Sequence, residues 1–297
     1  MVRGSPGQRQ NNNKREKENR MKVFILADGY GTQLSEHGPV VPKPLIEIGG
    51  RPILWHIMRI YSHHGLNEFV ICGGCNGSVI KDYFLNCMPY PRHFTLDLQS
   101  HAIEFHRSAS EPWQVTLVET DQKTMSSKRL KDYTGGATFC LTYGESLSDV
   151  NIRELIRFHR RQGALATVTA VRERSRFAAV NPSPERQRAA RLLEKHTSCE
   201  LVINGGFFVL EPDSLDVVER DSTSWESDLF ARLIQQDQLA VYRHDGYLQK
   251  MDTPLDRHVL QAQWDSGKPP WCVWNDEHEK SPKDLSSGVP SVTTAEA

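Results

Sequence analysis

The chain has 297 residues, of which 36 are lysine or arginine and 37 are aspartate or glutamate, so its formal net charge is −1. A charge so close to neutral excludes a protein that coats nucleic acid through a global positive field. Hydrophobic residues make up 38% and charged residues 25% of the chain, which provides for a large core and excludes disorder along the whole length.

The two ends of the chain differ in composition from its middle. Residues 1–20 are polar, with a run of asparagines beside lysine, arginine and glutamate, and residues 276–297 are similarly polar. We therefore expect a disordered tail at each end and one folded domain at residues 21–275. No apolar stretch approaches the roughly 18 residues of a membrane helix and no secretory signal is evident, so we expect a cytoplasmic protein that binds neither membrane nor nucleic acid.

The first predicted elements form a strand, a helix and a second strand. Residues 23–27 are a continuous apolar run, which is typical of a strand buried on both faces of a parallel sheet. Residues 52–63 carry apolar side chains at helical spacing, with Gly65 just beyond the end. Residues 69–72 are the next strand. Together they predict a right-handed βαβ unit.

Further strands and helices alternate along the rest of the domain. We expect strands at 138–142, 164–171 and 207–210, and helices at 152–162 and 226–235. This alternation predicts an α/β sheet with helices on both faces. The segments 94–105 and 115–119 are interpreted as antiparallel excursions that cover a site.

Six cysteines are scattered along the chain, which favours reduced, mostly buried thiols over a disulfide framework. Cys72 and Cys75 form a CxxC pair, but no second pair follows at the spacing of a zinc site. We therefore expect packing rather than zinc binding or redox chemistry from these thiols.

A glycine-containing loop follows the first predicted strand. It begins Leu26-Ala27-Asp28-Gly29-Tyr30-Gly31-Thr32-Gln33, and the backbone N–H groups of such a loop can point at phosphate oxygens. Farther on, Lys43 lies between Pro42 and Pro44, which fix its backbone. A preset cation facing this loop suits a triphosphate, although a plain surface turn followed by an exposed lysine fits the same residues equally well.

These residues carry a family resemblance. LADGYGTQL followed by PKP resembles the signature of the sugar nucleotidyltransferases, and the segments IEIGGRPILWHIMRIYSHHGLNEFVICGG, VIKDYF, EPWQVTLVET, INGGFFVL and KMDTPLDR resemble the glucose-1-phosphate cytidylyltransferases among them. The resemblance implies a Rossmann-like, GT-A-like mixed sheet flanked by helices, with small antiparallel excursions. It also implies a homo-oligomer that makes CDP-glucose and pyrophosphate from CTP and glucose 1-phosphate, on a route to surface polysaccharides such as O-antigen.

The resemblance further implies roles for individual residues. Mg²⁺ would be the cofactor, held by Glu145 and Asp252, and the implied catalytic residues are Lys43, Gln33 and Lys195. The implied nucleotide-binding residues are Leu26, Ala27, Asp28, Gly29, Tyr30, Gly31, Thr32, Gln33, Lys43, Ser126, Arg129 and Gly144. The implied sugar-binding residues are Glu194, Lys195, Asn204 and Gly205. Without the resemblance, Glu145 or Asp252 alone would be interpreted as a solvated loop acid.

The sequence departs from the family pattern inside this predicted site. The arginine of the family's GTR is Gln33, a glycine of the phosphate loop is Asp28, the metal aspartate is Glu145, and two glycines of MTGGR are Ser127 and Lys128. The changes at 28, 33 and 128 shift the formal charge by −1, −1 and +1, so the net charge of a site for two anionic substrates is more negative by one.

Three functional hypotheses follow from these observations. The first is an active enzyme of the resembling type. The second is a catalytically silent homologue that binds nucleotide or sugar nucleotide, or acts as an assembly subunit. A dinucleotide-dependent oxidoreductase fits less well, because GYGTQL lacks the final glycine of GxGxxG. For Trp113 and Trp225 we expect core or subunit packing in preference to a platform for sugar.

Overall fold

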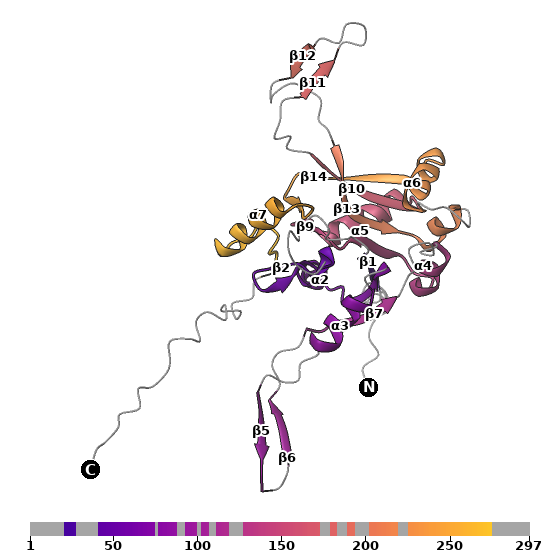
Figure 1. Cartoon of the computed structure of the whole chain (residues 1–297). Coiled ribbons are helices and arrows are strands. Elements are labelled where there is room, and N and C mark those ends of the chain that lie inside the picture. The colour runs from indigo at the N-terminus through magenta and orange to yellow at the C-terminus, as the bar shows by residue number, and fades with distance from the viewer. Residues whose placement is uncertain are drawn as a thin grey trace, which may run out of the picture.

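The molecule is built around one central sheet with helices on both of its faces (Figure 1). The computed structural model describes residues 21–27, 41–74, 77–87, 93–99, 102–106, 111–118, 127–172, 179–182, 189–193, 202–218 and 225–274. No helix in these ranges is long and apolar enough to cross a membrane.

The central sheet has seven strands and is mixed. Their order is β14 (Leu239–His244), β10 (Ala166–Arg172), β13 (Val202–Leu210), β8 (Phe139–Tyr143), β1 (Lys22–Leu26), β4 (Glu68–Cys72) and β7 (Gln114–Val118). Neighbouring strands are parallel except where β13 runs antiparallel to both β10 and β8. The α/β sheet predicted from the sequence is therefore confirmed.

The strand order reverses at the centre of the sheet. From β1 the chain passes to β4 and then to β7 on one side, and it later crosses back to β8 on the other side of β1. Open α/β sheets bind their ligands at such a reversal, beyond the carboxyl ends of the strands. The topology alone therefore points to the end of β1 and β8 as the place of the site.

Alternate residues of β1 contribute to two separate cores, because successive side chains of a strand point to opposite faces. Val23, Ile25 and Ala27 pack with α2 and α5, whereas Phe24 and Leu26 pack with α4 and α6. The six α-helices of the described residues are α2 (Ile53–His63), α3 (Gly77–Cys87), α4 (Ser127–Thr134), α5 (Ile152–Gln162), α6 (Trp225–Gln235) and α7 (Pro254–Asp265). The prediction of a first strand buried on both faces is confirmed.

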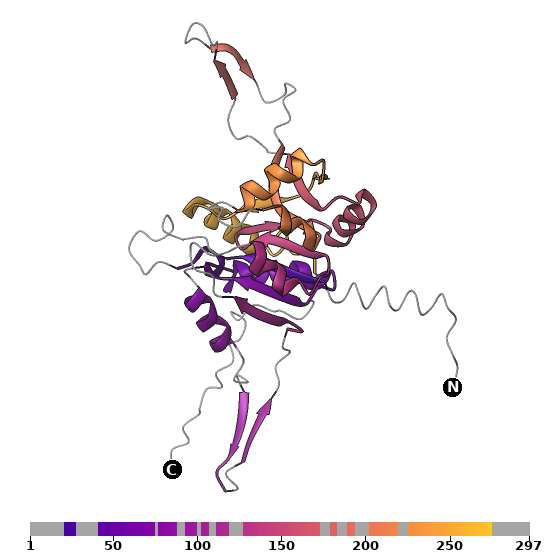
Figure 2. The same cartoon turned by 90° about the vertical axis from the view of Figure 1, so that its right-hand side faces the viewer.

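The small elements pair locally. They comprise β2 (Glu47–Ile48) with β3 (Arg51–Pro52), β5 (His93–Asp97) with β6 (Ala102–His106), β9 (Ser146–Ser148) with β15 (Leu248–Lys250), β11 (Ala179–Pro182) with β12 (Ala189–Leu193), and the 3-10 turns η1 (Lys43–Leu45) and η3 (Pro212–Val217). The antiparallel excursion predicted at 94–105 is present as β5 and β6. Figures 1 and 2 show it extending away from the sheet, so the expectation that it covers the site was wrong.

Residues 115–118 do not form the antiparallel excursion expected at 115–119 from the sequence, and residue 119 lies outside the described residues. They belong largely to β7, which pairs in parallel with β4 from Glu68 opposite Gln114 to Cys72 opposite Val118. The prediction was wrong because the alternating pattern of QVTLV is typical of an antiparallel strand with one exposed face. Here the same alternation arises because β7 is the edge strand, and it leaves every second side chain exposed.

The other predicted elements are confirmed, with small differences at their ends. The largest concerns β13, which begins at Val202 rather than at residue 207. Gly205 and Gly206 interrupt the apolar pattern there, so the first half of this strand could not be recognised from the sequence. The structure accommodates them through a register shift, because between the pairs Val168–Phe208 and Ala170–Asn204 three residues of β13 face one residue of β10.

Two of the cysteines confirm the expectation of reduced, buried thiols. Cys72 and Cys140 are free and fully buried, and burial raises the pKa of each thiol to about 12. A thiol that resists ionisation is a poor nucleophile and a poor metal ligand. Cys75, the second cysteine of the CxxC pair, lies outside the described residues.

Candidate functional site

The site begins where β1 and β8 end side by side. The backbone N–H of Gly144 donates to the carbonyl oxygen of Leu26 at 2.9 Å, and that of Ala27 donates to the carbonyl oxygen of Cys72, also at 2.9 Å. A Cβ atom at position 144 would lie only 2.9 Å from the ring of Pro44 and 3.2 Å from the oxygen of Leu26. Glycine is therefore required at this junction, which fixes the segment that carries Glu145.

The backbone of Lys43 is fixed by its two prolines, as the sequence predicts. Pro42 precedes the 3-10 turn η1, where its carbonyl oxygen accepts a hydrogen bond from the N–H of Leu45 at 2.9 Å. Pro44 is buried and packs against Gly144. Lys43 thus starts from a rigid turn wedged beside the end of β8, and its side chain is only 17% exposed.

Two carboxylates converge on the ammonium group of Lys43. Its Nζ lies 2.7 Å from Oδ1 of Asp252 and 3.1 Å from Oε2 of Glu145. Burial alone lowers the pKa of Lys43, but the hydrogen bond to Asp252 and the charge of Glu145 outweigh it, so the net shift is upward. The lysine is consequently charged at every physiological pH.

The short ladder between β9 and β15 brings the two carboxylates together. Ser146 pairs with Lys250 in this ladder, and the N–H of Met251 extends it by donating to the carbonyl oxygen of Glu145 at 2.9 Å. Glu145 therefore lies one residue beyond Ser146 at the ladder end and Asp252 two residues beyond Lys250, although the two acids are far apart in the chain.

The donor chemistry of this cluster fits a hard divalent cation. Mg²⁺ is usually held by one or two protein carboxylates together with phosphate oxygens of the substrate. Glu145 and Asp252 are two such groups, and they already face one positive charge. Within the described residues, no set of three or more His, Cys, Asp or Glu side chains lies close enough for a metal site made by protein alone.

Asn204 and Gly205 lie at the same edge of the sheet, on the neighbouring strand. β13 runs antiparallel to β8, so its first residues lie beside the carboxyl end of β8. Asn204 accepts a hydrogen bond at Oδ1 from the N–H of Gly206 at 2.8 Å. Gly206 has φ of +79°, and a Cβ there would lie 2.9 Å from the ring of Tyr143. The contacts that the structure describes for Asn204 and Gly205 are with Gly206 and with β10, and none of these contacts is to Lys43.

The structure does not test the remaining predicted residues in full. Arg129 lies in the first turn of α4, and its side chain is not among those described. The residues that fall outside the described ranges are Asp28, Gly29, Tyr30, Gly31, Thr32, Gln33, Ser126, Glu194 and Lys195. Their roles remain predictions.

Trp113 packs in the core, as the sequence analysis prefers. Its ring centroid lies 6.4 Å from that of Trp55 and 5.9 Å from that of Phe69. The ring therefore stabilises the packing of β7 against α2 and β4. The side chain of Trp225 is outside the described residues.

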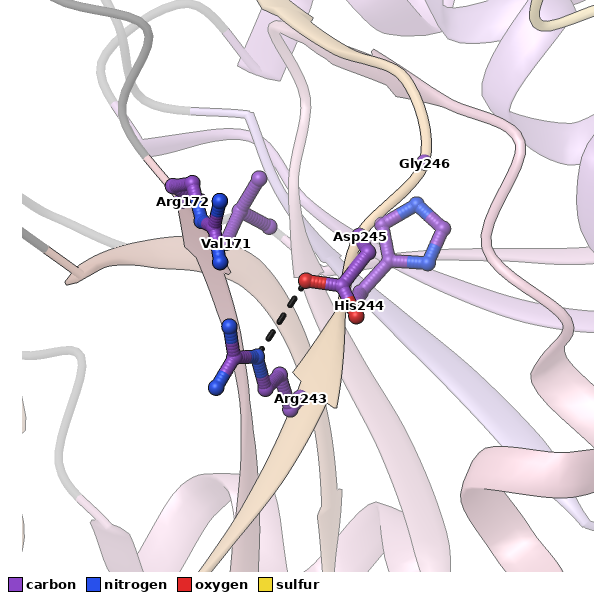
Figure 3. Close-up of a pocket in the computed structure, with 6 residues that line it drawn as sticks. All are labelled: Val171, Arg172, Arg243, His244, Asp245 and Gly246. Atoms are coloured by element: carbon purple, nitrogen blue, oxygen red, sulfur yellow. Dashed lines mark hydrogen bonds and ion pairs between the residues drawn. The ribbon is translucent and has the colours of Figure 1, made fainter. Parts of the chain in front are cut away.

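The sequence analysis missed a second polar cluster, which is formed by Ser148, Asp149, His244, Gly246 and Tyr247. We call it the Asp149 cluster. It borders a cavity of about 260 Å³ beyond β10 and β14. Figure 3 shows Arg243 paired with Asp245 on one side of this cavity, and the distance from Nε of Arg243 to Oδ1 of Asp245 is 3.2 Å. The lining residues are Val171, Arg172, Arg243, His244, Asp245 and Gly246. The Asp-Gly turn signal at 245–246 was the available hint.

Comparison with known proteins finds a family model and relatives that agree with one another. The nucleotidyl transferase family model matches residues 22–276. The chain is 42% identical to glucose-1-phosphate cytidylyltransferase of Salmonella typhi over 258 residues, which cover 86% of this chain and 100% of that protein. It is 39% identical, with the same coverage, to the probable glucose-1-phosphate cytidylyltransferase of Bacillus subtilis.

Solved structures share the fold at low identity. A UDP-glucose pyrophosphorylase of Acinetobacter baumannii superposes with a TM-score of 0.59 at 16% identity, covering 84% of this chain and 95% of that one. A putative glucose-1-phosphate thymidylyltransferase of Bacillus anthracis gives 0.57 at 17% identity, covering 82% and 94%. The family model, the relatives that align over their whole length and the shared fold agree, and the chain belongs to the nucleotidyl transferase family.

Proposed function

We propose that this protein transfers the CMP group of CTP to glucose 1-phosphate, which yields CDP-glucose and pyrophosphate. The observation that carries the proposal is the convergence of Lys43, Glu145 and Asp252 at the reversal between β1 and β8. The names of the Salmonella and Bacillus relatives support cytidine as the base and glucose 1-phosphate as the acceptor.

The chemistry is a substitution at phosphorus between two anions. A phosphate oxygen of glucose 1-phosphate attacks the α-phosphorus of CTP, a new P–O bond forms, and the bond to the β-phosphate oxygen breaks as pyrophosphate leaves. Positioning and charge neutralisation supply most of the rate enhancement in such reactions. A site for this reaction therefore needs fixed cations more than it needs acids or bases.

Lys43 provides one such cation. Its rigid turn and its two carboxylate partners hold the ammonium beside the end of β1, where the phosphate-binding loop of the resemblance begins. Because the charge is already oriented, little reorganisation is needed when the phosphates arrive. Lys43 would then neutralise charge near the reacting phosphorus.

Glu145 and Asp252 would hold Mg²⁺ together with phosphate oxygens of CTP. The bound ion would neutralise negative charge on the triphosphate and so favour attack by a second anion. The carboxylates that now pair with Lys43 are the same ones that the ion would use. Lys43 therefore keeps the two acids oriented and prevents their mutual repulsion until metal and nucleotide bind.

The catalytically silent homologue is the less favoured alternative. The lysine and both acids of the cluster are present and assembled, and the chain aligns with the complete length of the cytidylyltransferases of Salmonella typhi and Bacillus subtilis. We also propose, from the resemblance, a cytoplasmic homo-oligomer whose product serves surface polysaccharide synthesis such as that of O-antigen.

The test is a pyrophosphate-release assay of the full chain with glucose 1-phosphate and, in turn, CTP, UTP, dTTP and ATP. We expect the highest kcat/KM with CTP, loss of release on addition of EDTA, and recovery with excess Mg²⁺. Thermal melts with the same nucleotides run in parallel. A melt that shifts with nucleotide while none of the four supports turnover would reject the enzyme and favour the silent homologue.

A further inference from the structure

We propose that Asp149 and His244 are positioning residues, which fix the register between β9 and β15 and thereby the relative placement of Glu145 and Asp252. The contacts of the Asp149 cluster carry this inference. The predicted effect of these residues on metal binding rests on the proposed function, whereas their predicted effect on the pairing of β9 with β15 does not.

The two site carboxylates depend on a very short ladder. β9 and β15 contribute three residues each, paired from Ser148 opposite Leu248 to Ser146 opposite Lys250. Two-stranded antiparallel pairs are marginal on their own in water. A slip by one residue would turn every side chain of one strand to the other face. Something beyond the ladder must therefore hold its register.

The Asp149 cluster closes the far end of this ladder. The backbone N–H of Tyr247 donates to Oδ1 of Asp149 at 2.7 Å, and the N–H of Asp149 donates back to the carbonyl oxygen of Tyr247 at 3.3 Å. The hydroxyl of Ser148 also donates to that carbonyl, at 2.6 Å, and accepts from the N–H of Val150 at 3.2 Å. The three bonds to Tyr247 join the end of β9 to the residue before β15 in one register, and the bond from Val150 orients the Ser148 hydroxyl.

His244 ties the same carboxylate to the central sheet. Its Nε2 lies 2.9 Å from Oδ1 of Asp149, and His244 is the last residue of β14. β14 is paired with β10 from Leu239 to His244, so its end is held by the large sheet. Asp149 therefore bridges a rigid strand and a marginal ladder.

Gly246 provides the space for this bridge. A Cβ at this position would lie 2.4 Å from Oδ1 of Asp149 and 2.6 Å from Cε1 of His244, both closer than non-bonded atoms allow. Figure 3 shows Gly246 and His244 together on the wall of the cavity. The absence of a side chain lets the carboxylate lie directly on the turn between β14 and β15.

The geometry excludes a hydrolytic triad made of the same residue types. In a triad, serine and aspartate contact opposite nitrogens of the histidine ring. Here Asp149 Oδ1 at 2.9 Å and Ser148 Oγ at 3.4 Å both face Nε2. Ser148 is moreover nearly fully buried. The cluster is built to hold backbone in place, not to attack a substrate.

The experiment uses the full chain with two perturbations that act differently on the same contact. Asp149→Ala removes the carboxylate, and Gly246→Ala pushes it away while its chemistry stays intact. Asp245→Ala is the matched control, because this acid lies in the same turn and pairs with Arg243 instead. Hydrogen exchange of the Met251 amide reports the ladder, and that of the Ile25 amide in β1 reports the global fold.

We expect both cluster variants to exchange the Met251 amide about tenfold faster or more, with the Ile25 amide unchanged. Mn²⁺ binding in the presence of CTP, measured by electron paramagnetic resonance, should weaken by about 10- to 100-fold in both. The Asp245→Ala control should match the wild type in each measurement. These readouts require no turnover.

Three outcomes are decisive. Unchanged exchange at Met251 in both variants would overturn the proposal, and so would faster exchange with Mn²⁺ affinity equal to that of the wild type. Faster exchange at Ile25 as well would assign the cluster to global stability and would also reject it. If the wild type itself does not bind Mn²⁺, the metal assignment of the proposed function fails, and the exchange rates still decide whether the cluster holds the ladder.

Discussion

The environment of Lys43 gives a single residue two distinct tasks. Without ligand, its charge offsets Asp252 and Glu145, which would otherwise repel each other in a partly buried space. With substrates, the same charge is available to phosphate oxygens. A second lysine offers a natural comparison, because Lys131 also lies between two acids, Asp213 and Asp216, but on the surface beside η3.

Removal of the Lys43 charge should therefore lower turnover, because a cation is lost and because the two acids are left without their partner. We expect Lys43→Ala to lower kcat by about a thousandfold, by the precedent of single cations in phosphoryl transfer. The pyrophosphate-release assay measures this. Lys131→Ala breaks an equivalent triplet elsewhere and should leave kcat unchanged. Equal losses in the two variants would show that the effect is not specific to the site.

The two acids should differ in how they tolerate substitution. Asp252 agrees with the family residue, so Asp252→Ala should abolish metal-dependent nucleotide binding. Glu145 is one methylene longer than the aspartate of the family pattern, and Mg²⁺ demands near-ideal octahedral geometry. Glu145→Asp should therefore lower the Mg²⁺ concentration that gives half-maximal rate. Asp265→Asn, on the exposed end of α7, is the control, and a higher Mg²⁺ requirement in Glu145→Asp would contradict the assignment.

How far single residues could be predicted depended on their neighbours in the chain. The fixed backbone of Lys43 could be predicted from the two prolines that flank it. Asp252 could not be connected to it by any local pattern, because 209 positions separate the two residues and only the completed sheet brings them together. The family resemblance supplied that connection. The Asp149 cluster was missed because its members are likewise spread over distant segments.

Among the elements, α2 illustrates what a local pattern predicts well. Its apolar spacing, its initial proline and the following glycine all agree, and the helix covers Ile53–His63 as expected. Strands β9 and β15 are only three residues long, which is too short for any periodicity to be recognised. The edge strand β7 was misread because pairing direction is a property of the neighbouring strand and not of the sequence itself.

Helix α2 also carries a buried histidine, His56, which makes the packing of this helix depend on pH. His56 lies against Trp264 and Trp271, and its Nε2 lies 3.0 Å from the carbonyl oxygen of Ile48. Trp271 donates its indole N–H to Nδ1 at 3.4 Å, which requires a neutral ring. Burial lowers the pKa of His56 to about 4.

Stability should accordingly fall as the pH falls from about 6.5 to about 4, because the unfolded state then binds a proton that the folded state rejects. The difference amounts to about 3 kcal/mol across that window. Urea unfolding at pH 7.5 and pH 5 covers the upper part of that window and should show about 2 kcal/mol of the difference. His56→Gln should flatten the dependence in part, since burial also lowers the pKa of His64 to about 4. His258→Gln, on an exposed face of α7, is the control, and an unaltered slope in His56→Gln would refute the linkage.

At the scale of the whole molecule, the segment that holds Trp271 and Trp274 completes the core of the described residues. Trp271 is fully buried and Trp274 is nearly so, and both pack on α2. Arg59 of the same helix lies over the rings of Trp55 and Trp274, at 5.5 and 5.4 Å from their centroids. Trp274, the last residue that the structure describes, thus still contributes to this core, and the boundary near residue 275 stays a prediction.

Two truncations should separate the tails from the domain. A chain of residues 21–275 should melt within about 2 °C of the full chain, because the tails are expected to add no packing. A chain of residues 21–265 loses Trp271 and Trp274 and should melt about 10 °C lower or fail to fold. Differential scanning calorimetry measures both. A large loss of stability in the longer truncation would show that a tail belongs to the folded domain.

The contact between His56 and Trp271 also determines when the packing around α2 can form during synthesis of the chain. These residues are 215 positions apart. At a translation rate of about 5 to 20 residues per second, roughly 10 to 40 s pass between the emergence of the two. Throughout that interval the face of α2 that carries His56 has been synthesised, but Trp271 is not yet available to cover it. A nascent chain of this protein thus exposes this aromatic surface of α2 until Trp271 has emerged, and that surface is one that a chaperone would protect.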